Sequence, residues 1–444
     1  MSAVDHVYHY AGCSSLVGQD HGRSLFLVAD RIGKKEPETY LTAFAKEPDV
    51  TSRALRAVSE IVGSRFYVPP SMLARILREA DPVATVGPST VRFEGFSACC
   101  SAYIRLDIDE DALEVAHRTK GTTNVDFGPE LRALLAQTKP DSRLEITIGP
   151  RAVGLAHERA NVTERKVPLP VRWIKGFGEV QGHLSGMEKA FSLPPVSAQR
   201  FLRSLPRSKS DHQIWVAAAG PRVRTSTRPT PGSVPLRGGH RLRVFETLVG
   251  RAKALHVYGN PTLQSSTWVL DFGSQRLTLV LNAEPWRGFS GDGRLLSDLA
   301  RDEAEISALR AQLNWQDDLD LSTLARNTGL SHDQVNTAMS HLAALGLVGF
   351  DLAQSTWFHR VLPFDMDRVE AMNPRLKAAR KLVDTRAVTL EQGGAEVISD
   401  TTVHRVRFGD GAPSCTCPWY AKNKYTRGPC KHILAAEMET ERLQ

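Results

Sequence analysis

The sequence predicts an α+β protein of several domains, and three observations support this prediction. At 444 residues the chain is longer than one hydrophobic core usually serves, so two to four domains are expected. Helix-like spacing of apolar residues in TSRALRAVSEIV (51–62) is mixed with strand-like alternation in LEITIG (144–149). Three cysteines and a histidine gather near the C-terminus, which indicates a separate small module there.

The composition is that of a globular protein, with 41% hydrophobic and 24% charged residues. No apolar run approaches the roughly 18 to 20 residues that span a bilayer, and the N-terminal stretch lacks the features of a secretory signal. We therefore expect a cytoplasmic protein without a membrane partner. In a reducing compartment, clustered cysteines bind metal or perform chemistry more often than they form disulfides.

Residues 1–188 are expected to form a mixed α/β N-terminal domain. Its helix signals include VDFGPELRALLAQ (125–137), which enters through Gly128 and Pro129, because proline suits the first turn of a helix.

Residues 189–245 are predicted to be a basic connecting region rich in proline, glycine and arginine. This stretch holds eleven basic residues and one acid, a net charge of +10, so the rest of the chain carries −3 of the overall +7. Two interpretations stay open: a surface for a polyanion, or a solvated loop region whose arginines serve solubility.

Residues 246–293 read as a β-rich segment, in which STWVLDF and RLTLVLN flank a GSQ turn as in a hairpin. Residues 294–362 predict a helix followed by a winged-helix-like module, whose second helix begins with a capping box at Ser331 and Gln334. The module from 315 to 358 carries one basic residue, Arg326, against five acids. Because a phosphate backbone would repel it, a structural or protein-docking role is favoured over DNA reading.

Residues 363–444 contain Cys415-x-Cys417, twelve residues, and then Cys430-x-His432. Extended chain places both thiols of the first pair on one side, and the second pair lies where Pro429 precedes the helical sequence KHILAAEMETERL. Four protein ligands of these types suit one tetrahedral zinc ion of the structural kind, with no open position for water.

This pattern, with HRVRF before it and the words CTCPWY and GPCKHILA within it, resembles the SWIM zinc finger. The resemblance covers about residues 375–442 and implies that Cys415, Cys417, Cys430 and His432 are the zinc ligands. SWIM fingers are thought to bind DNA or proteins and do not catalyse. The C-terminal third also looks like bacterial SWIM proteins found beside MoxR-type AAA+ ATPases and von Willebrand A-domain proteins, which implies an accessory role with those partners.

No sequence motif of a known enzyme site stands out, so we expect a non-catalytic, zinc-binding adaptor. The alternative is a protein that binds DNA or RNA without sequence specificity through the basic stretch and the finger. The residues expected to contact nucleic acid would be Arg222, Arg224, Arg228, Lys422, Lys424, Arg427 and Lys431.

Overall fold

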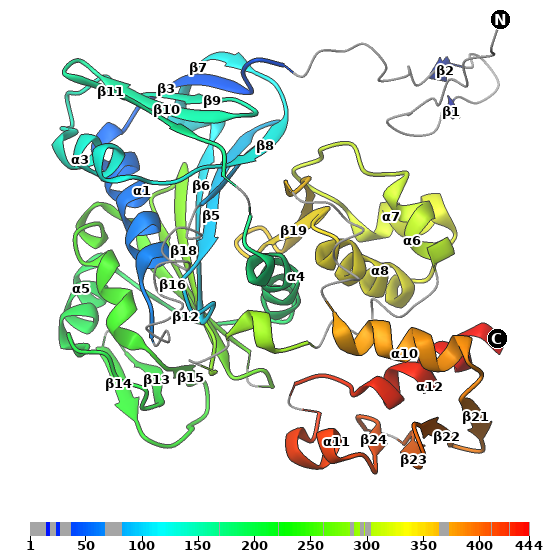
Figure 1. Cartoon of the computed structure of the whole chain (residues 1–444). Coiled ribbons are helices and arrows are strands. Elements are labelled where there is room, and N and C mark those ends of the chain that lie inside the picture. The colour runs from blue at the N-terminus through cyan, green and yellow to red at the C-terminus, as the bar shows by residue number, and fades with distance from the viewer. Residues whose placement is uncertain are drawn as a thin grey trace, which may run out of the picture.

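The computed structural model describes most of the chain (Figure 1). The described residues are 15–17, 24–26, 37–66, 82–167, 169–220, 222–260, 262–284, 288–293, 297, 303–363, 373–409, 411–425 and 427–443. The architecture is mixed α and β with several sheets, as the sequence predicts. Among these residues, none of the helices combines the length and the apolar character needed to cross a membrane.

An eight-stranded antiparallel sheet is the largest element of the fold. Its strands, in spatial order, are β12 (Glu188–Leu193), β16 (Ala254–Asn260), β17 (Ser265–Asp271), β18 (Gln275–Leu281), β6 (Ala102–Asp109), β5 (Thr90–Phe96), β4 (Val83–Val86) and β8 (Gly121–Asn124). The β17–β18 hairpin confirms the prediction made from its alternating residues. The β18–β6 pair joins strands from the predicted β-rich segment to strands of the N-terminal third, so these two stretches share one core.

A five-stranded sheet stands beside it, in the order β11 (Ala160–Arg165), β10 (Ala152–His157), β9 (Glu145–Ile148), β3 (Leu41–Ala45) and β7 (Leu113–Arg118). Helix α1 (Pro48–Gly63) packs on strands β5 and β6 and also on α3 (Pro129–Gln137). Both helices and β9 confirm sequence predictions, and α3 starts at Pro129 after Gly128 as expected. The N-terminal third of the sequence also contains β1 (Ser15–Val17), paired with β2 (Ser24–Phe26), and the 3-10 turn η1 (Glu110–Ala112).

The basic stretch is folded, so the prediction of a connecting region is wrong. It contains β12, α5 (Pro195–Ser204), a three-stranded sheet in the order β14 (Arg222–Ser226), β13 (Ile214–Ala219) and β15 (Val234–Leu236), and the 3-10 helix η2 (Gly239–Phe245). Its buried residues Phe201, Leu242 and Phe245 belong to the main core. The prolines mark the starts and edges of short elements: Pro195 begins α5, and β15, which contains Pro235, lies at a sheet edge, where a missing N–H is tolerated.

The C-terminal third follows the predicted order of elements. Helix α6 (Glu303–Arg310) precedes α7 (Leu321–Thr328) and α8 (His332–Ala344), and a hairpin of β19 (Val348–Asp351) and β20 (Thr356–His359) follows. The capping box of Ser331 and Gln334 is present at the start of α8, as predicted. Beyond them lie α10 (Pro374–Asp384), a sheet of β21 (Val388–Glu391), β22 (Gly394–Ser399), β23 (Thr402–Arg407) and β24 (Ser414–Cys415), and helices α11 (Pro418–Asn423) and α12 (Lys431–Leu443). Two short 3-10 turns, η3 (Val249–Arg251) and η4 (Phe289–Gly291), come before this part of the chain.

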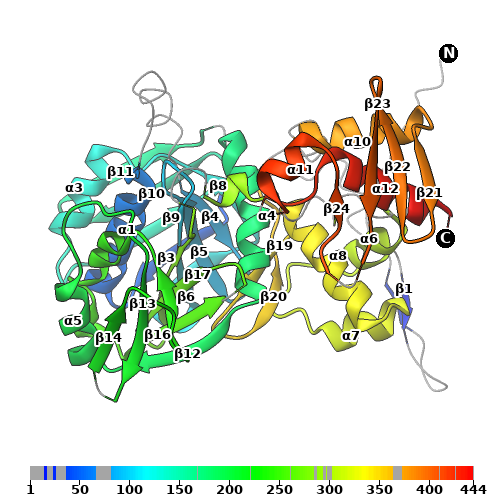
Figure 2. The ribbon, with the colours of Figure 1, turned by 90° about the horizontal axis from the view of Figure 1, so that it is seen from below.

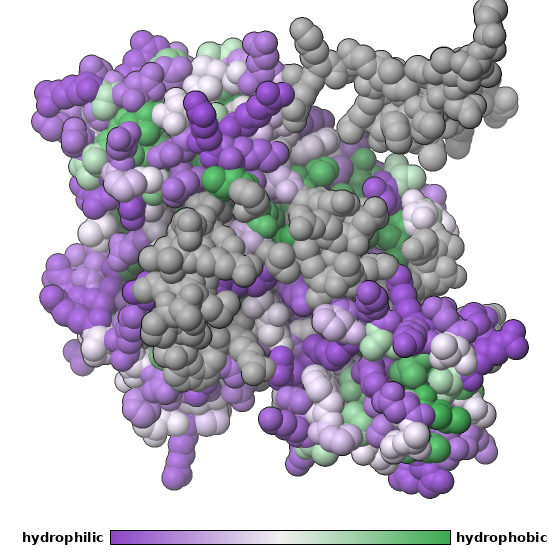
Figure 3. Space-filling model, viewed as in Figure 1, coloured by the Kyte–Doolittle hydropathy of each residue, from purple (hydrophilic) through white to green (hydrophobic). Residues whose placement is uncertain are grey.

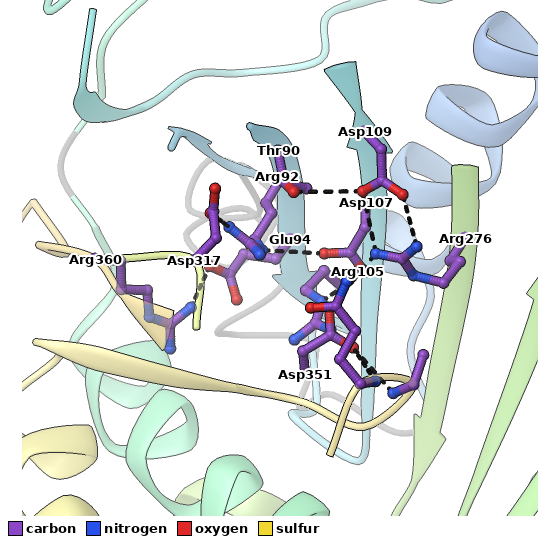
Figure 4. A network of polar contacts seen from close by, with 12 residues as sticks. Thr90, Arg92, Glu94, Arg105, Asp107, Asp109, Arg276, Asp317, Asp351 and Arg360 are labelled. Atoms are coloured by element: carbon purple, nitrogen blue, oxygen red, sulfur yellow. Dashed lines mark hydrogen bonds and ion pairs between the residues drawn. The ribbon is translucent and has the colours of Figure 1, made fainter. Parts of the chain in front are cut away.

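Helix α4 (Val171–Ser185) and the β19–β20 hairpin cover the face of the large sheet opposite α1, and a buried network of charges lies beneath them (Figure 4). On the sheet, Arg92 lies 3.2 Å from Asp107, and Arg105 lies 2.9 Å from the same carboxylate. Glu94 is fully buried and pairs with Arg360, which follows β20. Oppositely charged residues on neighbouring strands therefore satisfy one another where water is excluded.

Helices α7 and α8 and the β19–β20 hairpin form a helix-and-hairpin module (residues 315–362), and two of its acids complete this network. Asp317 lies 3.2 Å from Arg92, and Asp351, at the end of β19, lies 3.9 Å from Arg105 and 3.5 Å from Arg276. Arg105 also donates to the backbone carbonyl of Phe350 at 2.7 Å. The acids that make this module a poor match for DNA are thus partly used to hold it on the large sheet.

Candidate metal centre

Four residues near the C-terminus bring their metal-binding atoms together. The sulfur atoms of Cys415, Cys417 and Cys430 and a ring nitrogen of His432 all lie within 4.8 Å of one another, and all four residues are buried. The Nδ1 atom of His432 is 3.8 Å from the sulfur of Cys415 and 4.0 Å from that of Cys430. A tetrahedral zinc ion with ordinary bond lengths would separate such atoms by about 3.6 Å, so the cluster fits zinc.

The local backbone explains why these residues converge. Cys415 ends the short strand β24, opposite Val406 of β23, and extended chain carries on to Cys417 at the N-cap of α11. The two thiols are two residues apart and lie on one side, as the sequence predicts. Cys430 directly precedes α12 and His432 lies in its first turn, which also agrees with the prediction.

Backbone amides support the thiols as anions. The N–H of Tyr420 donates to the sulfur of Cys417 at 3.4 Å, and that of Ile433 donates to the sulfur of Cys430 at 3.5 Å. Hydrogen bonds from Cys415, His432 and the backbone at the start of α12 lower the pKa of Cys430 to about 4, although burial opposes this shift. Zinc binds the thiolate, so the low pKa of Cys430 favours metal binding, whereas the hydrogen bond to Cys430 raises the pKa of Cys415 and burial raises the pKa of Cys417.

Arg375, near the start of α10, holds the loop that delivers Cys430. Its guanidinium donates to the carbonyls of Arg427 at 2.8 Å and Pro429 at 2.6 Å, and it stacks on the ring of Trp419 at 4.6 Å. Sequence reasoning missed this residue because it lies forty residues before the first ligand cysteine and belongs to no spacing pattern. The signal that was present is weak: an arginine directly after the proline that opens a helix.

Replacing Arg375 by alanine should lower zinc affinity by about ten- to a hundredfold, because residues that orient metal-binding loops have effects of this size. The measurement is a competition titration against a chromogenic zinc chelator. Lys377→Ala, which removes an exposed cation from the same helix, is the matched control and should leave the affinity unchanged. Equal affinities for Arg375→Ala and the wild-type protein would show that the loop holds its shape without this arginine.

The finger is joined to the rest of the protein by helix α12. Ile433 and Ala436 pack with the ligand cysteines, while Leu434 and Ala435 pack with Leu376 and Ala379 of α10. The second cluster also includes Ile174 of α4 and Ala344 of α8. A further contact runs from the Arg427 side chain to the carbonyl of Gly291 at 3.4 Å.

The residues proposed to contact nucleic acid occupy two separate places. Arg222, Arg224 and Arg228 are exposed on and after β14, which lies away from the finger, to its left along the lower edge in Figure 1 and at the opposite end of the molecule in Figure 2. In the finger, Lys422 and Lys424 are exposed and Arg427 is half-buried. Lys431 donates to the hydroxyl of Ser399 at 2.8 Å, which ties α12 to β22. Trp419 packs against the core of the zinc module.

Comparisons with known proteins identify the C-terminal module. No curated protein matches the chain at the level required for a relative. Among solved structures, the crystal structure of Proliferating Cellular Nuclear Antigen from Entamoeba histolytica matches with a TM-score of 0.36 and 12% identity, covering 55% of this chain and 98% of that chain. A family model, the SWIM zinc finger, matches residues 404–440, which contain all four clustered ligands. Residues 404–440 are therefore a SWIM zinc finger with one structural zinc ion, and the clustered Cys415, Cys417, Cys430 and His432 fit its four ligands.

Proposed function

We propose that the protein is a non-catalytic adaptor of the cytoplasm, accessory to a MoxR-type AAA+ ATPase and a von Willebrand A-domain protein. The observation that carries this proposal is the closed zinc site, in which four buried protein ligands leave no position for a substrate or water. A metal held in this way stabilises a binding module and supplies no reaction centre. The finger then presents α11 and its exposed lysines to a partner.

We assign a docking role to the helix-and-hairpin module, as a winged helix that does not read DNA. Helix α8 carries no arginine or lysine, so the element that would enter the major groove has no cation for phosphates. Two of the module's acids instead contact arginines of the large sheet. Its role in the adaptor is to connect the finger to the body.

Association of the purified proteins tests the proposal. The zinc-loaded chain should form a complex with a purified MoxR-type ATPase and a purified von Willebrand A-domain protein, detected by size-exclusion chromatography with light scattering. Cys430→Ser should weaken the complex, because the finger would lose its fold. A complex that is absent with the zinc-loaded chain would refute the proposed partners.

Nucleic-acid binding is the second candidate, favoured by the exposed cations on β14 and in the finger. Their separation means that a short oligonucleotide would contact one group or the other. We expect weak, sequence-independent binding at low salt that falls steeply as salt rises. Replacing Arg222, Arg224 and Arg228 together by glutamate should abolish it, as measured by fluorescence anisotropy of labelled duplex and single-stranded DNA. No binding by the wild-type protein at low salt would remove this candidate.

A further inference from the structure

Strand β14 is an exposed sheet edge. It pairs with β13 on one side, and within the described part of the chain no strand pairs with its other side. Its residues alternate, so that Val223 packs against the main core while Arg222 and Arg224 are exposed. Such an edge presents a row of backbone N–H and C=O groups to solvent and can accept another strand.

The segment that contains this edge is strongly basic. Three of the eleven basic residues in 189–245 are used internally: Arg237 donates to the carbonyl of Ala283, Arg241 to the hydroxyl of Ser101, and Arg243 to the carbonyl of Leu205. The other eight are exposed, against one exposed acid, Asp211. These eight are Lys189, Arg200, Arg203, Arg207, Lys209, Arg222, Arg224 and Arg228.

Several of these cations lie close to the edge. Helix α5 carries Arg200 and Arg203 and packs against β14. The part of Figure 3 where α5 and the β13–β14 strands lie is dominated by hydrophilic residues. Two copies of this edge would repel one another, because like charges directly opposite across a strand pair are destabilising. The charge pattern thus disfavours self-pairing and favours an acidic partner.

We propose that β14 is the docking edge for an extended acidic segment of a partner protein, which adds as a further strand with acids at alternate positions. Alternate acids would all lie on the face that carries Arg222 and Arg224, since strand side chains repeat every two residues. The chain itself pairs such residues across neighbouring strands. Arg92 opposes Asp107 at 3.2 Å, and Arg405 opposes Glu396 at 3.0 Å.

An added strand uses both features of this edge, the unpaired backbone and the alternating arginines, whereas a nucleic acid would use the charge alone. The proposal gives the adaptor a second surface and rests on the proposed function only in assuming that the protein binds other proteins. It does not depend on the finger, which lies apart from β14 in both ribbon views.

The test uses labelled seven-residue peptides and the full-length, zinc-loaded protein in fluorescence anisotropy. A peptide that alternates glutamate with threonine should bind at least tenfold more tightly than an isomer with the same residues but its glutamates grouped together. The variant Arg222→Glu/Arg224→Glu should lose at least tenfold in affinity for the alternating peptide and gain affinity for a lysine–threonine peptide. Arg200→Glu/Arg203→Glu, which changes the net charge equally on α5, is the matched control and should lose less.

Three outcomes would overturn the proposal. Equal affinity for the two isomers would mean that charge alone binds the peptide. Tighter binding of single-stranded DNA, with the same sensitivity to the β14 variant, would mark a nucleic-acid surface. Loss of peptide binding in Cys430→Ser would place the site on the finger. Failure of both peptides to bind would also overturn it, and since this result leaves the association with the ATPase unaffected, the two proposals fail separately.

Discussion

Cys430→Ser should release the zinc ion and unfold the finger while the large sheet keeps its fold. Structural zinc contributes on the order of 10 kcal/mol to a small module, far more than the packing of the five other buried residues around the ligand cysteines can replace. The wild-type protein should contain about one zinc per chain. Metal analysis of the purified variant, combined with limited proteolysis, measures both effects, and new cleavage sites should appear within residues 404–443.

Cys99→Ser is a suitable control for this experiment. It removes a buried thiol from the body of the protein, where Cys99 accepts a hydrogen bond from Arg241, so zinc content should stay at the wild-type level. If Cys430→Ser keeps its zinc, or resists protease as well as the wild-type protein does, the assignment of Cys430 as a ligand is wrong.

Asp351→Ala should lower the free energy of unfolding by about 3–5 kcal/mol, because removal of one partner leaves buried charges uncompensated. The Asp351 side chain is 1% exposed and lies near Arg105 and Arg276, which are also largely buried. It also accepts hydrogen bonds from the backbone N–H groups of Ala353 and Gln354 at 2.9 and 3.2 Å. Urea denaturation followed by circular dichroism measures the change. Asp333→Ala, which removes an exposed acid from the same module, should leave stability nearly unchanged.

The effect of Asp351 should depend on pH. Burial disfavours its charged form, but Arg105, then Arg276 and Arg92, lower its pKa below the ordinary value of 3.8. A group whose pKa is lower in the folded state stabilises the fold above the unfolded-state pKa, and this contribution is lost as pH falls through the folded-state value. The stability difference between wild type and Asp351→Asn should therefore narrow below about pH 4. A difference that stays constant down to pH 2 would show that the charge of Asp351 contributes nothing.

The zinc site was predictable because its information is local. All four ligands lie within eighteen residues. The extended chain at the first two cysteines and the start of α12 at Cys430 and His432 determine where the sulfur and nitrogen atoms lie. The same holds for α1, α3 and the β17–β18 hairpin, because the spacing of apolar residues that predicts each element lies within one short stretch of sequence. The sequence analysis did not predict the folding of residues 189–245, because it took proline and glycine as signs of loops. In the structure these residues lie at the ends of elements only three to ten residues long, and burial against distant strands stabilises those elements.

The buried charge network beneath α4 and the β19–β20 hairpin could not be predicted from the sequence for a different reason. In β5 and β6, charged residues alternate with apolar ones, as at Arg92 and Glu94, which normally indicates a face open to water. That face is covered by a hairpin more than two hundred residues later in the chain. Alternating charged residues in a strand indicate that one face of the strand is polar. Only the tertiary structure shows whether water or another part of the chain contacts that face.

The helix-and-hairpin module contacts the sheet through matched buried charges, so the two surfaces are complementary in charge. A module transplanted from another protein of the same fold would pack its apolar residues and still leave Arg92, Arg105 and Arg276 facing the wrong side chains. Leaving such charges uncompensated costs several kcal/mol each, so functional chimeras should require exchanging residues 315–362 together with the charged positions of β5, β6 and β18. Recombination that moves this module between proteins must therefore change both surfaces together. The module and the sheet surface that it contacts are exchanged as one unit.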